Sequence, residues 1–403
     1  MGTLQILLLI LCIFDLIKNK KILSPRFLFN FIFFISSSLY EWHFSYIQQE
    51  LSDRTELILL NCVVFYNLTY YYFEHIFNKD KFFKLIKKLK EKFNIKNKLP
   101  KIKTSMNKRI KIAKYIVIVT FIIECIYSKG FPLLWKFTDD ARSYLEFGIP
   151  SLNGALDGLI ICLGAYSLFS KSKDKYIYLL IGLCVISRQI ILSMFIEGII
   201  YFILSSNKKI SYKKIGLLVV IAFIGFTAIG NFRSGNDTMD NVFMPKKQYQ
   251  KIPSSMKWTY SYITFSVSNF NNLVSITDGG MNHGASMLSE FMPTVILNKV
   301  NIKPKFNQDY LVHSAYNTCT YLPSIYLDFG MFGIIVFNSL IALLGYLLYQ
   351  GATKKKSTKN ILLYSVFAHN IILLFFINMF LYLPVLVQFV YIPLIFSGDN
   401  DEK

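Results

Sequence analysis

Long apolar runs alternate with short lysine-rich loops along the chain, and this alternation restricts the fold more than any other feature. The runs are about 14 to 27 residues long, enough to span or nearly span a bilayer as helices. Only 17% of the residues are charged, whereas a soluble domain carries about 25%. We therefore predict an all-α polytopic membrane protein in which residues 1–403 form a single membrane domain.

The lysine clusters predict the orientation of the spans, because loops rich in Lys and Arg stay on the cytoplasmic side of a membrane. Residues 78–114 hold fifteen basic residues against two acids, and we expect a basic cytoplasmic loop at 78–112. Four smaller basic loops also belong inside: Lys18–Arg26, Lys171–Lys175, Lys208–Lys214 and Lys354–Lys359. The net charge of +20 follows from this lysine excess, which also attracts anionic lipid, so nucleic acid is not an expected partner.

Eleven spans fit between these loops, with the N-terminus outside and the C-terminus inside. They are predicted at about 3–17, 27–46, 56–73, 113–128, 151–169, 176–187, 190–205, 215–231, 323–349, 361–377 and 380–396. The runs 176–205 and 361–396 are each interpreted as a tight helical hairpin. The first run lacks the basic start and the cleavage site of a signal peptide, so we expect it to be retained.

Two sizeable segments remain outside, at about 129–150 and about 232–322. The second is far longer than an ordinary connection, which indicates a functional segment. Its aromatic content predicts helices at Ser254–Val274 and Ala285–Leu297, the second broken at Pro293. We expect the aromatic stretch from Trp258 to Phe270 to lie on the membrane surface or to stack on sugar rings.

Arginine is scarce, with six among 44 basic residues, and four of the six belong to the predicted outer face. A guanidinium binds phosphate or carboxylate with a planar fork, whereas lysine offers a point charge. Arg54 and Arg142 stand beside acids, so a local salt bridge is the alternative for both. Arg188 lies between two apolar stretches, where a charge is costly unless it faces a polar cavity or partner. Arg233 follows Gly230-Asn231 at headgroup height, where a lipid diphosphate would lie, and a snorkelling anchor is its alternative.

Four other ionisable groups lie inside predicted spans: Glu124, Asp157, Glu197 and His369. Each can pair with Arg188 across the bundle, and a structural pair is the expected role. Asp157 lies between Gly154 and Gly158, whose small-xxx-small spacing lets helices approach closely.

His283 and His313 belong to the large outer segment, where an imidazole can act as a base on a sugar hydroxyl or make a surface hydrogen bond. The chain contains no phosphate-binding loop, zinc-protease signature or nucleophile elbow. The outer acids are scattered without the spacing of metal ligands, so we expect neither a metal nor another cofactor.

Several motifs follow one another in a fixed order. The order is a short Arg-bearing outer loop, a Ser187-Arg188 hairpin, a helix ending Gly230-Asn231-Phe232-Arg233, a long aromatic outer segment, Asn317-Thr318-Cys319-Thr320-Tyr321, and Tyr326-Leu327-Asp328-Phe329-Gly330-Met331-Phe332-Gly333. This order resembles the O-antigen and capsular repeat-unit polymerases of the Wzy type, which are distant relatives of the O-antigen ligases. The resemblance covers roughly residues 110–350, while the N-terminal third resembles membrane helices in general.

The resemblance implies a GT-C-like bundle and a metal-independent glycosyl transfer on the outer face of the bacterial plasma (inner) membrane. The donor would be a glycan on undecaprenyl diphosphate, and the acceptor a newly flipped repeat unit on the same lipid. A flippase and a chain-length regulator are implied partners. Arg142 and Arg233 match functional arginines of the family's two main outer loops, and Arg188 matches the Ser-Arg position. His313 lies near the place of a ligase histidine, and Asn231 and Asn317 are expected to bind substrate as members of the matched motifs.

Other functions are compatible with the same pattern. A ligase would use the same donor with a different acceptor, and a flippase or other transporter would also place charges inside the membrane. Transporters usually contain internal repeats with paired broken helices, and we find no internal repeat in the sequence. The large outer segment and the placement of the arginines favour an enzyme over a transporter or a non-catalytic scaffold.

Overall fold

The computed structural model describes residues 2–18, 22–76, 88, 104–138, 142–170, 172–206, 242–292, 296–297, 299 and 310–397. Within these ranges the chain is helical, and its β pairing is one isolated bridge between Ser45 and Pro245. The prediction of an all-α protein is confirmed. The expected span 215–231, most of the basic loop 78–112, and the residues Asn231 and Arg233 lie outside the described residues.

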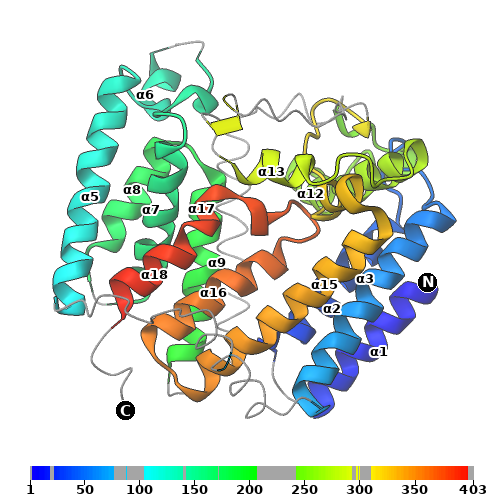
Figure 1. The fold of residues 1–403 in the computed structure, drawn as a ribbon. Coiled ribbons are helices and arrows are strands. Elements are labelled where there is room, and N and C mark those ends of the chain that lie inside the picture. The colour runs from blue at the N-terminus through cyan, green and yellow to red at the C-terminus, as the bar shows by residue number, and fades with distance from the viewer. Residues whose placement is uncertain are drawn as a thin grey trace.

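One side of the bundle consists of the N-terminal helices packed with α15 and α16 (Figure 1). These helices are α1 (Thr3–Lys18), α2 (Pro25–Tyr40), α3 (Asp53–Tyr71, continued by a π-helical turn at Tyr72–Ile76), α15 (Leu322–Lys354) and α16 (Thr358–Ile372). The hydroxyl groups of Ser24 and Ser52 accept backbone N–H groups and so begin α2 and α3. α2 ends before the predicted residue 46 because His43 adopts a left-handed conformation, with φ 46°.

The other side consists of helices from the middle and the end of the chain. They are α5 (Met106–Tyr127), α6 (Pro132–Phe137), α7 (Leu152–Leu168), α8 (Lys175–Cys184), α9 (Arg188–Ser205), α17 (Leu383–Leu386) and α18 (Gln388–Phe396). The tight hairpin expected at 176–205 is confirmed, with three residues between α8 and α9. α16 and α9 pack together and join the two sides.

The tight hairpin expected at 361–396 is wrong. α16 ends at Ile372, and residues 373–387 form a segment that we call the second strap, with a short 3₁₀ turn η5 (Met379–Leu381) and the single turn α17 before α18 begins. Pro384 opens α17, where its missing amide hydrogen is tolerated, and prevents a continuous helix through this segment.

The small-xxx-small spacing in α7 has the predicted effect. A Cβ atom at Gly154 would lie 3.1 Å from Leu383 Cδ2, and a Cβ atom at Gly158 would lie 2.4 Å from the carbonyl oxygen of Pro384. α17 therefore packs against α7 at a distance that only glycine permits at residue 158.

Several helices turn apolar side chains away from the protein at helical spacing. The exposed stripes are Ile6, Ile10, Ile13 and Ile17 on α1; Ile112, Ile116, Val119, Ile123 and Ile126 on α5; and Phe329, Phe332, Val336, Leu340 and Leu344 on α15. Among the described residues, α9 and α15 are long and apolar enough to cross a membrane by length and composition. Apolar stripes of this extent are unusual on a soluble monomer.

Two helices of the large segment lie across one end of the bundle, at the top of Figure 1. They are α12 (Ser254–Ile276) and α13 (Ala285–Phe291), which confirms the helices predicted from Ser254 and from Ala285. Tyr260, Phe265 and Phe270 are at most 6% exposed, so the expectation that these rings lie on the membrane or stack on sugars is wrong. We call this end the α12 end, and the opposite end, which carries the basic residues near Lys114 and Lys354, the lysine end.

A kink in α15 fastens the residues before α13 to the bundle. Gly330 has φ 56° and ψ −147°, which interrupts the helix. The carbonyl groups of Tyr326 and Leu327 accept hydrogen bonds from Gly280, Met281 and Asn282 at 2.7–3.0 Å. The carboxylate of Asp328 accepts the N–H groups of Ser286 and Met287, at the start of α13, at 2.9 and 2.8 Å. The Tyr326–Gly330 motif therefore holds part of the large segment in place.

Candidate functional site

Arg188 is the sequence-predicted site residue that the structure buries most deeply. It begins α9 at the α12 end and is 7% exposed. Its guanidinium carbon lies 5.8 Å from the centre of the Tyr262 ring of α12, a cation–π distance. A buried guanidinium held against an aromatic face at the end of a helical bundle is suited to bind an anion that reaches this end.

Tyr262 connects Arg188 to two other segments. Its ring lies 5.2 Å from the ring of Phe376 in the second strap. Tyr316 lies in the same neighbourhood: burial raises the pKa of Tyr316, and the nearby Tyr262 adds to this rise. The Tyr316 ring in turn lies 6.0 Å from the His313 ring. The structure thus links Arg188 and His313, both predicted from sequence, through two tyrosines that were not predicted.

Residues 310–321 form the first strap, which crosses the same end of the bundle. Asn269 of α12 holds this strap: its Nδ2 donates to the carbonyl groups of Tyr316 and Thr318 at 2.8 and 2.7 Å, and its Oδ1 accepts Val312 N–H at 2.8 Å. Asn269 is 0% exposed. Because its amide groups are bonded on both sides, the first strap is fixed to α12.

His313 and Asn317 lie on the first strap, as the prediction of a common site requires. His313 is half-buried, and its Nδ1 accepts Ala315 N–H at 3.1 Å, so the neutral ring carries its proton on Nε2, which can donate to a ligand. Asn317 is exposed. A histidine in this position is able to exchange a proton with a ligand bound beside Tyr316.

The second strap carries a buried polar group that the protein does not satisfy. Asn378 is 5% exposed, and Asn370, in the last turn of α16 just before the strap, is 0% exposed. Within the described residues neither amide has a hydrogen-bond partner on its nitrogen or its oxygen. Each unpaired buried polar group costs about 1–3 kcal/mol of folding free energy.

A buried cluster of polar side chains flanks the second strap on both sides. His369 precedes the strap, and its Nδ1 lies 3.1 Å from Glu197 Oε1 while its Nε2 lies 3.0 Å from Ser193 Oγ. Gln388 follows the strap, and its Nε2 donates to Glu197 Oε1 at 3.2 Å. All four side chains are at most 1% exposed. The expectation that Glu197 or His369 pairs with Arg188 is replaced by a pair that the two residues make with each other.

Arg142 lies in another part of the same end, in the segment between α6 and α7. Its Nη1 donates to the carbonyl group of Ser128 at 2.6 Å, and its guanidinium carbon lies 4.2 Å from the centre of a Trp135 ring. The second strap reaches the helix that follows this segment, because Leu383 and Pro384 pack against Gly154 and Gly158 of α7. The strap therefore runs from the ring of Tyr262 to the start of α7.

Arg54 has a structural role over a long sequence distance. Its Nη1 lies 2.5 Å from Asp278 Oδ1 and its Nη2 donates to the Asp278 carbonyl group at 3.1 Å. Asp278 stands just before the glycine pair that bonds to α15. The local pairing with flanking acids that the sequence suggested is replaced by a contact between α3 and the large segment.

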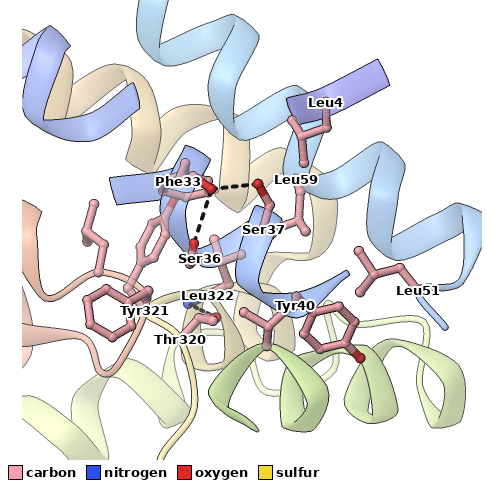
Figure 2. Close-up of a pocket in the computed structure, with 13 residues that line it drawn as sticks. Leu4, Phe33, Ser36, Ser37, Tyr40, Leu51, Leu59, Thr320, Tyr321 and Leu322 are labelled. Carbon is pink, nitrogen blue, oxygen red and sulfur yellow. Dashed lines mark hydrogen bonds between the residues drawn. The ribbon is translucent and has the colours of Figure 1, made fainter. Parts of the chain in front are cut away.

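A pocket between α2 and residues 320–322 is too small for a substrate (Figure 2). Its volume is about 20 Å³, the space of one or two water molecules. Figure 2 shows that the Ser36 and Ser37 hydroxyl groups bond back to the carbonyl group of Phe33, at 3.2 and 2.7 Å. This pocket is a packing gap between α2 and the end of the first strap.

Metal ligation finds no support in the described ranges, where no three His, Cys, Asp or Glu side chains come together as ligands would. Five residues of the site were not predicted from the sequence: Tyr262, Asn269, Tyr316, Asn370 and Asn378. A signal existed for Asn378, because it is the lone polar residue between the apolar runs 371–377 and 379–381. No comparable signal distinguishes Tyr262 or Asn269 from the other polar and aromatic residues of α12.

Comparison of the chain with known protein families, with curated proteins and with solved structures gave no match. The function is therefore argued from the chain's own residues and from the motif order described above.

Proposed function

We propose that the chain is a multi-pass membrane protein with about eleven spans and the α12 end on the outer face. The exposed apolar stripes of α1, α5 and α15 support spans, because they suit contact with lipid tails. The contacts between distant segments support the orientation. Predicted outer segments meet at the α12 end, as in the Ser45–Pro245 and Arg54–Asp278 contacts. Predicted inner residues meet at the lysine end, as in the Lys114–Asp174 pair.

We infer that the protein polymerises undecaprenyl-diphosphate-linked oligosaccharide repeat units into O-antigen or capsular polysaccharide by glycosyl transfer on the outer face. The observation that carries this inference is Arg188, a guanidinium buried at the α12 end against Tyr262. When the glycan leaves its lipid carrier, negative charge develops on the departing diphosphate. A guanidinium already oriented in a site with little water stabilises this charge without further rearrangement.

The other predicted residues are assigned roles in the same reaction. Arg142 and Arg233 are proposed to bind diphosphate, in keeping with the resemblance. His313 takes the proton of the acceptor hydroxyl on Nδ1, which exchanges its bond from Ala315 N–H for the hydroxyl group while Nε2 keeps the ring proton. The hydroxyl oxygen then bonds to the donor's anomeric carbon as the bond to diphosphate breaks. Asn231 and Asn317 bind sugar hydroxyl groups. The two lipid-anchored substrates meet in one plane, which lowers the entropic cost of bringing them together.

Arginine-to-lysine variants test the function. Arg188→Lys, Arg142→Lys and Arg233→Lys keep the charge and lose the fork, so each should lower the rate of polymer formation by about 10²–10³-fold. Arg109→Lys is the matched control, because Arg109 lies at the lysine end, where it donates to the Ile395 carbonyl group. The assay follows extension of lipid-linked repeat units by purified protein. Full-length polymer from the Arg188 variant would remove the anion site from the mechanism.

The acceptor distinguishes a polymerase from a ligase. A polymerase returns the lengthened glycan to undecaprenyl diphosphate, whereas a ligase moves it to a different acceptor. Product that leaves the lipid carrier when a second acceptor is supplied, with no lengthening, would replace polymerisation with ligation.

One observation favours a transporter as a second candidate. Glu197 and His369 form a buried pair inside the bundle, and ionisable pairs at such depth often carry protons in transporters. A flippase driven by protons would move lipid-linked oligosaccharide only when a proton gradient is imposed on vesicles. Polymer formation in detergent, where no gradient exists, would favour the polymerase.

A further inference from the structure

Asn370 and Asn378 stand out among the buried asparagines because their amides lack partners. Within the described part of the chain neither nitrogen nor oxygen is bonded in either residue. Asn269 and Asn338 are just as deeply buried, at 0% exposed, and both of their amide groups are bonded. In Asn338, Oδ1 accepts from the hydroxyl group of Tyr321 at 2.7 Å and Nδ2 donates to the Ile334 carbonyl group at 2.8 Å. The fold thus provides hydrogen-bond partners for the amides of buried asparagines that have a structural role.

The location of Asn378 associates it with the surroundings of Arg188. It stands between Phe376, whose ring contacts Tyr262, and Met379, whose Sδ lies 3.6 Å from Gln189 Nε2. Tyr262 and Gln189 are, respectively, the ring against Arg188 and the residue after it. An anion at Arg188 and a group bonded to Asn378 are therefore neighbours at the α12 end.

The side chain of Asn378 is unbonded although the backbone around it is tied to its neighbours. The Leu374 carbonyl group accepts Tyr321 N–H at 3.0 Å, and the carbonyl group of Asn378 itself accepts Leu381 N–H at 3.2 Å. The unsatisfied atoms therefore belong to the side-chain amide and not to an unbonded stretch of chain.

We propose that Asn378 and Asn370 bind the hydroxyl groups of a saccharide whose diphosphate is held by Arg188. The proposal rests on the proposed function and names the residues that recognise the sugar. A carboxamide presents two donors and an acceptor oxygen, and a sugar hydroxyl both donates and accepts, so the two asparagines match a polyhydroxylated ligand. The free protein retains unbonded amides because these bonds are made with the ligand.

Leucine variants test the proposal through stability, which needs no ligand. Leucine has nearly the shape of asparagine and no polar atoms, so Asn378→Leu and Asn370→Leu should each raise the Tm of purified protein by about 2–4 °C. Asn338→Leu is the matched control and should lower Tm, since it removes both hydrogen bonds of a satisfied amide, including the acceptor of the buried Tyr321 hydroxyl group. A fall in Tm for both Asn378→Leu and Asn370→Leu would overturn the proposal, because it would mean that the protein itself satisfies these amides.

A binding measurement separates the sugar from the diphosphate. The probes are undecaprenyl diphosphate and undecaprenyl diphospho-N-acetylglucosamine, each added to wild-type protein and to Asn378→Leu. We expect the sugar-bearing lipid to raise wild-type Tm more than the bare diphosphate, and Asn378→Leu to lose this difference while keeping the response to diphosphate. Equal responses to the two lipids in wild-type protein would overturn the sugar site. Sugar-dependent binding without any polymer formation would instead support the sugar site and contradict only the proposed polymerase activity.

Discussion

The two straps that cross the α12 end differ in how they treat their buried polar groups. The first strap, 310–321, is bonded along its length: Asn269 makes three hydrogen bonds to it, and Thr318 Oγ1 lies 3.2 Å from Ser266 Oγ. The second strap, 373–387, is followed by Gln388, which donates to Glu197, and preceded by His369, whose Nδ1 lies 3.1 Å from the same carboxylate; the side-chain amide of Asn378 in its middle has no partner within the described residues.

This difference indicates which of the two straps resists displacement and which is displaced more easily. A segment with satisfied polar groups resists displacement, because each broken bond leaves a buried group unpaired. A segment with unsatisfied groups gains hydrogen bonds when a polar ligand replaces its present neighbours. The first strap therefore holds His313 in place, and the proposed sugar site belongs to the second strap, where the amide of Asn378 is left for a ligand.

Removing the amide that holds the first strap should have the largest effect on stability. Asn269→Leu breaks three hydrogen bonds and leaves the backbone groups of residues 312, 316 and 318 unpaired, which should cost about 3–6 kcal/mol. Thermal unfolding of purified protein measures this loss. Ser275→Ala is the control on the same helix, because its exposed hydroxyl bonds only within α12. A loss below 1 kcal/mol would remove the contrast between the straps.

A larger side chain at Gly158, which packs against α17 in the second strap, should have the next largest effect on stability. In Gly158→Val the new Cβ would lie 2.4 Å from the Pro384 carbonyl group, so α17 must move away from α7, at a cost of about 1–3 kcal/mol. Gly351→Ala is the control, because the nearest atom to its added Cβ is 3.8 Å away. The measurement is Tm together with polymer formation. An unchanged Tm in Gly158→Val would show that the second strap is loose at this end as well.

A double-mutant cycle on the hydroxyl groups of Ser266 and Thr318 tests the same comparison, with a smaller expected effect on stability. Thr318→Val alone should cost about 1 kcal/mol, because it leaves the Ser266 hydroxyl group with a weaker set of partners. Thr318→Val combined with Ser266→Ala should cost less than the sum of the two single changes, since neither hydroxyl group then remains unpaired. Purely additive costs would indicate that the pair does not hold the first strap.

The smallest effect is expected at the surface contact between α3 and the large segment. Arg54→Gln removes the pair with Asp278, whose side chain is 92% exposed, and exposed pairs contribute about 0.2–1 kcal/mol. The loss should shrink further at 1 M salt because exposed charges are screened. A loss of several kcal/mol, independent of salt, would place Arg54 among the residues that hold the site together.

Much of the helical architecture was predictable, because apolar runs between charged loops leave the backbone little alternative to helices. The starts of α7, α8, α9, α12 and α13 were predicted to within two residues. The break in 361–396 was not, although Pro384 and Asn378 lie within it, because an apolar run of that length fits two helices equally well. Arg188 and His313 were predicted as site residues, whereas the tyrosine rings beside them, Tyr262 and Tyr316, were not.

The sequence by itself determined the helical class, the close approach at Gly158 and the scarcity of arginine, because each depends on composition or on spacing along one helix. Only the tertiary structure decided that Glu197 pairs with His369 and that Arg54 pairs with Asp278, since these contacts join residues far apart in the chain. The contrast between Asn338 and Asn378 is of the same kind. Both are asparagines in apolar surroundings, and whether an amide is satisfied depends on the neighbours that packing brings to it.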